Sequence, residues 1–371
     1  MKTISLAKKL WDYAYSKQRQ PGHKPSYAAS TLYSYYGILT MYAAAQAAYA
    51  TKDEEWMSQV VAMQERYPFD FESPELYFRY NFDNYRVGGM GKPWLMLRGY
   101  FNDEHKEEVR KYAEKTLAAP QSRDGIMCNP HCPQDEKIWI DTVFTVTPYM
   151  LYAGLLLKED KYIDFAVDQC FKMYDVFMDR SNGLLHQARG FMGDKTTISH
   201  DHWSRGNGWG YIGLTELVRY LPKDSKYYDE AVERYIAHTE AMVKYQDHRG
   251  LWRQSIAEPL AWEEESGSGI ILYGIGVGMR LGLLDKEKYM PVLYKGVAGL
   301  MEFCINDDYS IDRCCHGCLC PGATPERKGT IEAYLVDVAP RRNDGHAFGP
   351  AIMALTEAYR NGIVDVPWRT E

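Results

Sequence analysis

Apolar residues along this chain recur every three or four positions, the spacing of one face of an α-helix. Between residues 163 and 177 they form one stripe, made by Ile163, Ala166, Cys170, Tyr174 and Phe177. The same spacing predicts helices at 32–49, 109–117, 144–157, 209–221, 228–243, 270–284 and 348–358, and shorter ones at 4–16, 54–66, 92–101 and 291–303. We therefore expect an all-α fold with about a dozen helices.

Strand-like alternation is sparse in this sequence. The best case is 330–338, with a short piece at 251–255. Turn residues such as Ser-Asn-Gly at 181–183 separate the helical stripes, and no Pro/Ser-rich linker or charge block divides the chain. We therefore expect one domain over residues 1–371. Without a regular short repeat the common solenoids are disfavoured, which leaves a bundle or a closed ring of helical hairpins.

Composition and charge narrow the possible partners. Of 371 residues, 46% are hydrophobic, which supports a large core and argues against disorder. The net charge of −7 argues against nucleic acid as the main partner, because phosphate binding needs a basic face. It also disfavours long polyanions, but it leaves room for a small anionic ligand held by one or two local arginines.

Neither a membrane span nor a secretion signal is apparent. We find no run of about 18 apolar residues, so we expect no membrane partner. The first twenty residues carry Lys2, Lys8 and Lys9 without an apolar core, which predicts a charged amphipathic helix and not a signal peptide. This favours a cytoplasmic location, unless a signal has been trimmed.

Aromatic residues are abundant, with 30 Tyr and 9 Trp. Rings with a polar edge suit sugars, because they stack on C–H faces while their OH or N–H groups bind hydroxyls. Packing between helices is an equally good explanation at this stage. Eight cysteines include a cluster at 314–320, whose single Cys-x2-Cys unit with His316 does not match the paired units of a zinc knuckle. A thiol-rich loop is the favoured interpretation of this cluster.

Unusual polar chemistry is concentrated in loops that precede or open apolar helices. Asp141 lies between Trp139 and a strongly apolar stretch, where desolvation would raise its pKa and suit it to general acid catalysis. A helix N-cap is the competing explanation, and it applies equally to Asp83. His186 follows a Gly-Leu-Leu turn and on its own indicates a structural histidine.

The segment 203–209, Trp-Ser-Arg-Gly-Asn-Gly-Trp, is the most distinctive stretch. Two Trp, the forked cation of Arg205, Asn207 and two Gly indicate a receptor for a carboxylate and a ring. It is not a phosphate loop, because the glycine and lysine spacing of that motif is missing. Loops of this kind at helix starts would converge at one end of a ring of hairpins, where helix N-termini favour anions.

Together these segments resemble glycoside hydrolase family 105, the unsaturated rhamnogalacturonyl hydrolases, which are related to the unsaturated glucuronyl hydrolases of family 88. The resemblance rests on Trp-Ile-Asp-Thr-Val-Phe at 139–144, Gly-Leu-Leu-His at 183–186 and the 203–209 segment. Weaker matches are Gly-Leu-Trp at 250–252, Glu-Ser-Gly-Ser at 265–268 and Asn-Asp-Gly-His-Ala-Phe-Gly-Pro at 343–350. In order, the matches run from about Asp83 to Pro350.

This resemblance implies an (α/α)6 barrel and an unusual reaction. Polysaccharide lyases leave a C4=C5 double bond in a terminal uronate, and enzymes of this kind hydrate that vinyl ether. By similarity, Asp141 would protonate C4 and then activate water for attack at C5, while Asp83 would maintain its protonation state. The substrate-binding residues implied in the same way are Tyr36, His131, Trp139, His186, Trp203, Arg205, Asn207 and Trp209. Of these, Tyr36, His131 and Trp139 are placed by their order along the chain and not by a motif.

The implied partner is a disaccharide-sized unsaturated oligosaccharide, and the chemistry requires no metal or organic cofactor. A galacturonyl group linked to rhamnose is the first substrate expectation, and a glucuronyl oligosaccharide is the alternative. A non-catalytic oligosaccharide-binding barrel and a sugar epimerase are the alternatives of other classes, the latter because His200 and His202 are paired. The cysteine segment 304–321 has no counterpart in the motifs, and the oligomeric state is not indicated.

Overall fold

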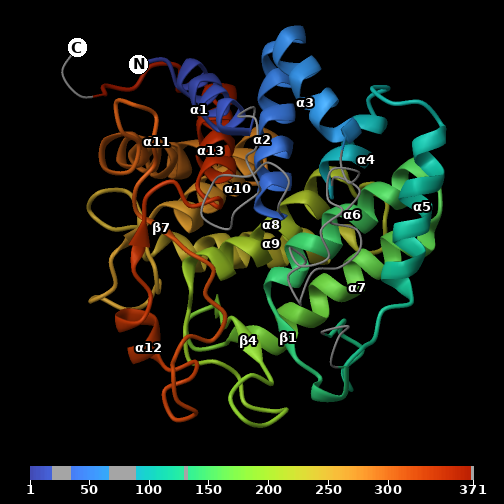
Figure 1. Ribbon diagram of the computed structural model, residues 1–371, viewed down its shortest axis with the longest axis vertical. Helices are drawn as coiled ribbons and strands as arrows, with labels where there is room; N and C mark the ends of the chain where they lie inside the picture. The colour runs from blue at the N-terminus through green and yellow to red at the C-terminus, as the bar shows by residue number, and fades with distance from the viewer. Residues whose placement is uncertain (19–34, 67–88, 129–132, 369–371) are drawn as a thin grey trace.

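The computed structural model describes residues 1–18, 35–66, 89–128 and 133–368. Six helices form an inner ring in the order in which they occur along the chain (Figure 1). They are α2 (Tyr35–Thr51), α4 (Gly91–Met96), α6 (Asp141–Leu157), α8 (Ser204–Tyr220), α10 (Glu265–Leu281) and α13 (Phe348–Arg360). Each contacts the next, and α13 packs against α2, so the ring is closed.

Six further helices alternate with these along the chain and pack against the outside of the ring. They are α1 (Thr3–Gln18), α3 (Glu54–Arg66), α5 (Glu104–Leu117), α7 (Asp160–Phe177), α9 (Tyr228–Val243) and α11 (Lys286–Phe303). The pairs α2–α3, α6–α7, α8–α9 and α10–α11 are hairpins, while α1 packs on α13. This is the expected (α/α)6 barrel.

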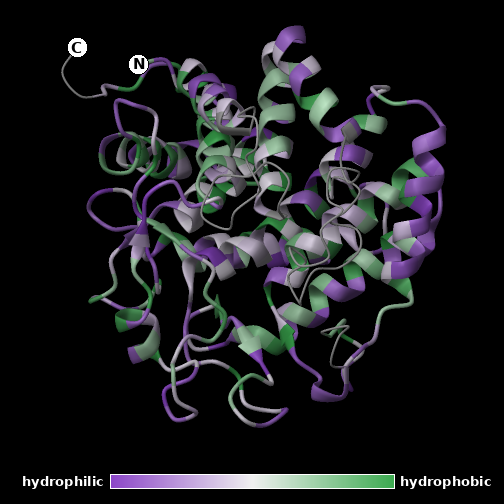
Figure 2. Ribbon diagram, in the orientation of Figure 1, coloured by the Kyte–Doolittle hydropathy of each residue, from purple (hydrophilic) through white to green (hydrophobic). Residues whose placement is uncertain are grey.

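Sequence pattern explains which helices are inner and which are outer. The inner helix α6 is apolar on nearly every side, and residues 142–154 are all buried. The outer helix α5, at the right of Figure 2, is mostly hydrophilic and buries only Val109, Ala113 and Thr116. A helix with protein on all sides needs no polar face, whereas one at the surface needs one. Among the described residues, no helix is both long and apolar enough to cross a bilayer.

Close packing between neighbouring inner helices depends on small residues. A Cβ atom at Gly274 in α10 would lie 2.1 Å from Cε1 of Tyr211 in α8, far inside van der Waals contact. Only glycine therefore lets the Tyr211 ring lie against the backbone of α10. The ends of the ring are also tied together, since the Thr3 amide donates to the Val364 carbonyl at 2.9 Å.

Short antiparallel strand pairs, two residues each, lie next to the starts of the inner helices. In the described part of the chain they are β1 (Ile138–Trp139) with β4 (Ala188–Arg189), β2 (Met178–Asp179) with β3 (Leu184–Leu185), β5 (Trp252–Arg253) with β6 (Glu263–Glu264), and β7 (Cys314–Cys315) with β8 (Pro340–Arg341). A 3-10 turn, η3 (Pro133–Asp135), precedes β1. β1 leads directly into α6 and β6 into α10, so these pairs fix where the inner helices begin.

Two expected elements were wrong. The segment 330–338 is not a strand but the short helix α12 (Ile331–Val336), because the Thr330 hydroxyl caps it by accepting a hydrogen bond from the Ala333 amide at 3.3 Å. The helix expected at 92–101 ends at Met96, and the chain then turns through Gly99, which has φ of +83°. The short strand expected at 251–255 is present as β5.

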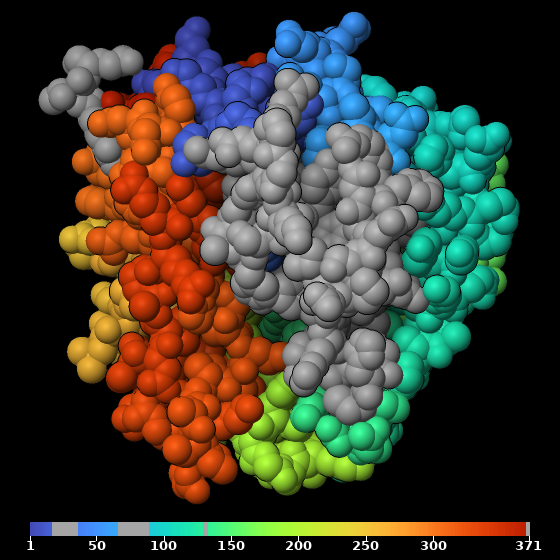
Figure 3. All heavy atoms as spheres, viewed as in Figure 1, coloured from blue at the N-terminus to red at the C-terminus, as the bar shows by residue number. Residues whose placement is uncertain are grey.

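The segment between α11 and α13 is long and contains α12 and β7. It lies along the lower left of the molecule in Figure 3, where it forms much of that side of the surface. This segment carries the cysteine cluster. Its strand β7 contacts α10, which places the cysteines beside the start of an inner helix.

Candidate active site

Most of the residues expected in the site lie at the starts of inner helices. Asp141 is the first residue of α6, the segment 203–209 opens α8, and Tyr36 is in the first turn of α2. Asp83 and His131 lie outside the described residues, so their expected roles remain predictions. The convergence of helix-start loops follows from the alternation of inner and outer helices, since all inner helices run in the same direction.

Asp141 has the environment expected of a general acid. It does not cap its helix, because the N-cap position is Ile140 and makes no side-chain hydrogen bond. Its Oδ2 is buried and has no hydrogen-bond partner among the described residues. Desolvation raises the pKa of Asp141 to about 7, although the Arg205 charge opposes the shift, while the Asp201 carboxylate adds to it. The carboxyl group is thus half protonated near neutral pH.

Asp201 is a site residue that the sequence argument did not single out. It is fully buried, and its Oδ2 accepts a hydrogen bond from the Trp203 amide at 2.9 Å. It supplies a nearby negative charge that raises the pKa of Asp141. Its position in the His-Asp-His-Trp run just before α8 was the available signal, but nothing in the sequence showed that its carboxylate would face Asp141.

The three tryptophans are buried against protein side chains. Trp209 stacks on Phe144 of α6, with ring centroids 4.3 Å apart, and its indole N–H lowers the pKa of Asp141 without reaching normal hydrogen-bond geometry. Trp139 meets Phe191 edge to face at 6.1 Å. Trp203 lies under the Arg205 guanidinium, 4.4 Å from its carbon. Their stacking on a sugar remains a prediction.

Arg205 is fully buried and makes several contacts with the segments around it. Its Nη1 donates to Ser266 Oγ at 2.8 Å and to the Cys315 carbonyl, and its Nη2 donates to the His316 carbonyl at 2.9 Å. Its Nε has no partner among the described residues. Arg205 therefore ties α8 to the start of α10 and to β7, and it places a positive charge near Asp141.

Asn207 uses its whole hydrogen-bonding capacity within the protein. Its Nδ2 donates to the carbonyls of Leu185 and Trp203, each at 3.0 Å. Its Oδ1 accepts from the Leu185 amide at 2.8 Å and lies 3.2 Å from Nε2 of His238. An amide has two donor and two acceptor positions, and all four are used. Asn207 therefore holds β3, and with it His186, against the first turn of α8.

His186 is half-buried beside this pair of elements. Its Nδ1 lies 2.9 Å from the Asp201 carbonyl, which can only accept, so Nδ1 is the donor, and in the neutral ring the lone pair is on Nε2. The His186 ring lies 4.8 Å from the His202 ring. The structure therefore places His186 on the same loop system as Asp201 and Asp141.

Tyr36 contacts a pair of residues that the sequence argument left among the weaker matches. Its ring lies 4.7 Å from that of His346, whose Nδ1 is 2.5 Å from Asp344 Oδ1. The Asp344 carboxylate and the His346 ring are both buried at the start of α13. The Asn-Asp-Gly-His stretch was the signal, and the structure joins it to α2 at the closure of the ring.

A buried glutamate pair opens α10. Glu264 caps the helix, since its carboxylate accepts from the amides of Ser266 at 3.0 Å and Gly267 at 2.6 Å. Burial, and then the Glu264 charge, raise the pKa of Glu265 well above its ordinary value. Neither carboxyl oxygen of Glu265 has a hydrogen-bond partner among the described residues. Glu264 thus fixes where α10 begins, and burial favours the neutral form of the Glu265 carboxyl group.

In the described part of the chain, all cysteines are free thiols. Sγ of Cys315 lies 3.8 Å from Sγ of Cys318, and both are buried. Among these residues the cluster does not bring three metal-ligating groups together. The carbonyls of Cys315 and His316 instead receive the Arg205 guanidinium, so the segment with no counterpart in the motifs supports the 203–209 segment.

Comparison with known proteins adds independent evidence. Residues 8–362 match the model of Glycosyl Hydrolase Family 88. An unsaturated 3S-rhamnoglycuronyl hydrolase of Alteromonas sp. is 24% identical over 46% of this chain and 42% of that protein. An unsaturated rhamnogalacturonyl hydrolase of Bacillus subtilis is 22% identical over 75% of this chain and 77% of that protein. The match to the Alteromonas protein spans less than half of that relative's length.

A solved structure of a C. acetobutylicum glycoside hydrolase from family 105 matches the fold, with a TM-score of 0.79 and 20% identity over 95% of this chain and 99% of that one. This confirms the barrel expected from the sequence. The family model spans nearly the whole chain, and its match includes all the segments on which the resemblance rested. The chain therefore belongs to Glycosyl Hydrolase Family 88, a family of glycoside hydrolases.

Proposed function

We propose that this protein releases a terminal 4,5-unsaturated uronic acid from short, lyase-cut oligosaccharides by hydrating the C4=C5 double bond. The observation that carries the proposal is Asp141, an acid with a pKa of about 7 whose Oδ2 is buried and free of partners among the described residues. Such a group can donate a proton to carbon and then, as a carboxylate, accept one from water.

In this mechanism Asp141 protonates C4, and positive charge develops at C5 and the ring oxygen. Water then attacks C5 while Asp141 takes back a proton, so the enzyme is unchanged after one turnover. The product hemiketal opens, and the bond to the leaving sugar breaks without further catalysis. The separation rule for retaining and inverting carboxylate pairs does not apply, because the anomeric carbon is not attacked.

The surrounding residues divide into two groups by their contacts. Burial is the main cause of the raised pKa of Asp141, and nearby residues adjust it: Arg205 and Trp209 lower this pKa, while Asp201 raises it. Asn207 holds the His186 strand in place through its amide. We propose that His186, Trp139 and Tyr36 contact the sugar, with Asp83 and His131 as further predicted partners. In this proposal Trp203 supports Arg205 from below.

The substrate we propose is an unsaturated galacturonyl group linked to rhamnose, in an oligosaccharide of about disaccharide size. The two relatives described above are named as an unsaturated 3S-rhamnoglycuronyl hydrolase and an unsaturated rhamnogalacturonyl hydrolase, and the family is one of glycoside hydrolases. An unsaturated glucuronyl oligosaccharide is the alternative within the same chemistry. We further propose that residues 1–371 act as one catalytic domain.

The test is the ultraviolet absorbance of the C4=C5 bond, followed with unsaturated galacturonyl-rhamnose and with an unsaturated glucuronyl disaccharide. We expect the wild-type protein to remove the absorbance of the first, and Asp141→Asn to lower the rate roughly 10²- to 10⁴-fold. Asp141→Asn should remain folded at neutral pH, because a carboxylate that is costly to ionise is replaced by a neutral amide.

The outcomes separate the alternatives. Loss of absorbance only with the glucuronyl substrate keeps the mechanism and changes the sugar. Tight binding with no loss of absorbance would support a non-catalytic binding barrel, and conversion of a saturated sugar would support an epimerase. Full activity in Asp141→Asn would overturn the role of Asp141.

A further inference from the structure

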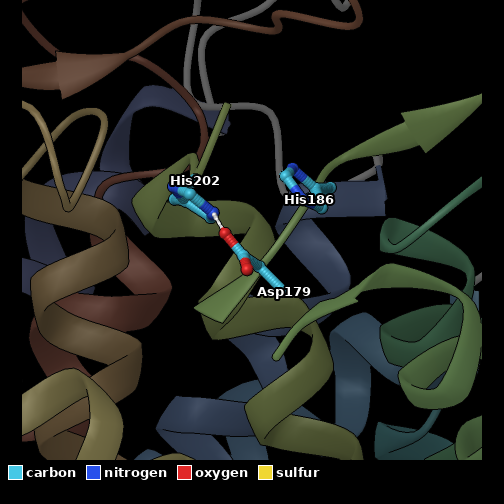
Figure 4. Close-up of side chains that lie close together, drawn as sticks. All are labelled: Asp179, His186 and His202. Carbon is cyan, nitrogen blue, oxygen red and sulfur yellow. Dashed lines mark hydrogen bonds and ion pairs between the residues drawn. The ribbon is translucent and has the colours of Figure 1, made fainter. Parts of the chain in front are cut away.

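We propose that Asp179, His186 and His202 form a binding site for a single transition-metal ion of the zinc class. One ligand-capable atom from each of the three residues lies within 4.8 Å of the other two. Figure 4 shows the three side chains converging from separate segments: Asp179 from β2, His186 just after β3 and His202 just before α8. Such a site goes beyond the hydration reaction, which uses no metal.

The spacing of the three residues is close to that of a metal site. His202 Nε2 lies 3.1 Å from Asp179 Oδ2. Two ligands of a tetrahedral zinc ion, with bonds near 2.0–2.1 Å, lie roughly 3.3 Å apart, so this pair already has the required separation. The ligand atom of His186 lies within 4.8 Å of both, so the His186 ring must move toward this pair to complete the set. The ion would take the place of the proton between His202 Nε2 and Asp179 Oδ2. That proton would move to Nδ1 of His202.

The surroundings of the three residues orient them as ligands. The Asp201 carbonyl accepts from Nδ1 of His186, and this leaves the lone pair of Nε2 for a metal. The Ser181 amide donates to Asp179 Oδ1 at 2.8 Å, and an outer hydrogen bond of this kind fixes the direction of a ligand in known metal sites. Asn182 Nδ2 lies 2.9 Å from Asp179 Oδ2 and 3.3 Å from His202 Nε2, so a bound ion would displace this amide from the pair.

The chemistry of the donors selects the ion. Two imidazole nitrogens and one carboxylate suit Zn²⁺, Co²⁺ and Ni²⁺ better than Mg²⁺ or Ca²⁺, which prefer oxygen alone. The side chains of Asp179 and His202 are 23% and 11% exposed, so an ion can reach them and keep a water as its fourth ligand.

A bound ion should inhibit the hydration reaction, and this consequence rests on the proposed function. The ion would occupy Nε2 of His186, which we place against the substrate. It would also bring positive charge near Asp201, whose carboxylate helps to keep Asp141 protonated. Both effects lower the rate, so Zn²⁺ would act as a reversible inhibitor.

Binding is tested independently of activity. The apo protein is titrated with Zn²⁺ by calorimetry and with Co²⁺ by visible absorption. We expect one ion per chain and a Co²⁺ spectrum without thiolate charge-transfer bands. His202→Gln and Asp179→Asn should each weaken binding by at least about tenfold. His200→Ala is the matched control, because this exposed histidine lies two residues from His202 and outside the cluster.

Cys315→Ser separates this site from the cysteine cluster. If the ion bound there, the Co²⁺ spectrum would show thiolate bands, and Cys315→Ser would abolish binding while His202→Gln would not. That outcome, or no saturable binding of either ion by the wild-type protein, would overturn the proposal. Binding without inhibition would keep the metal site and contradict only the placement of His186 against the substrate.

Discussion

At the scale of single residues, Asp141 shows how function can oppose stability. Its burial raises its pKa to about 7, so the folded protein binds this proton more tightly than the unfolded chain does. The contribution of this group to stability is therefore greatest below the unfolded pKa of about 4 and is lost as pH rises toward 7. Burial of Asp141 therefore costs stability at neutral pH, and in return the Asp141 carboxyl group is still partly protonated there.

The same pKa predicts the pH dependence of the rate. If protonated Asp141 delivers the proton, kcat/KM should be constant below pH 7 and fall about tenfold per unit above it. Asp201→Asn removes the carboxylate that raises this pKa, so the alkaline limb should move to lower pH. The measurement is a pH–rate profile on an unsaturated disaccharide. A limb that is unmoved in Asp201→Asn would mean that another group controls it.

The sequence predicted only some of the residues of the candidate site. Motif and context singled out Asp141, but the sequence pattern on its own favoured a helix cap over catalysis, because an N-cap and a first helical residue differ by one position. The structure argues against the cap, since Ile140 occupies the N-cap position, and the catalytic role of Asp141 stays a prediction. Asp201 and the Asp344–His346 pair were not singled out, because their proximity to site residues depends on contacts between distant segments.

At the scale of elements, the link between β3 and α8 should control the position of His186. Asn207→Ala would leave the Leu185 amide and carbonyl and Nε2 of His238 without this partner, at a cost of about 1–3 kcal/mol in the free energy of unfolding. Asn207→Ala should also raise KM, because His186 comes directly after β3 and would lose its fixed position when β3 is no longer held. The measurements are urea unfolding and steady-state kinetics.

Asn306→Ala serves as the control for this prediction. Its amide bonds Ser310 at 3.1 Å and Asp312 at 2.8 Å in a partly exposed turn, away from β3. We expect a smaller loss of stability and an unchanged KM. If Asn207→Ala changed stability but left KM unaltered, Asn207 would support the fold without positioning His186.

Element types were largely predictable, whereas their ends were not. The apolar period of the outer helix α9 gives its bounds, Tyr228–Val243, as expected. Helices α8 and α10 begin five residues earlier than their apolar stripes suggest, at Ser204 and Glu265. Their first turns are polar and glycine-rich because they form the site, so the pattern that marks a helix is weakest where function is concentrated.

At the scale of the whole molecule, the ring explains much of the tyrosine content. The largest fully buried side chains include Tyr42, Tyr149, Tyr152, Tyr162 and Tyr174, all on helices of the barrel. Packing between helices was one of two explanations left open by the composition, and it accounts for these residues. The number of predicted helices and the helical spacing of apolar residues along the whole chain indicated a ring or a bundle. The contact that closes the ring, between α13 and α2, joins the two ends of the chain, and the spacing of apolar residues carries no information about it.

One buried carboxylate joins four of the inner helices. Glu216 of α8 accepts hydrogen bonds from Tyr42 of α2 at 2.9 Å, from Tyr152 of α6 at 2.6 Å and from Tyr273 of α10. Arg219 lies 3.3 Å away and also donates to it. Tyr152 is eleven residues after Asp141 on α6, which places this hub roughly 16 Å along the helix from the proposed acid.

Glu216→Ala should therefore reduce stability with little effect on the chemistry. It removes one partner of a buried charge pair and leaves three tyrosine hydroxyls without their acceptor, so we expect a loss of about 3–5 kcal/mol in the free energy of unfolding.

Glu216→Gln keeps an acceptor and should lose less stability than Glu216→Ala. Glu230→Ala, at an exposed pair with Arg234, should lose at most about 1 kcal/mol. Chemical denaturation, with activity measured well below the unfolding transition, distinguishes the cases. A stable but inactive Glu216→Ala protein would mean that the hub acts on the site and not on the closure of the ring.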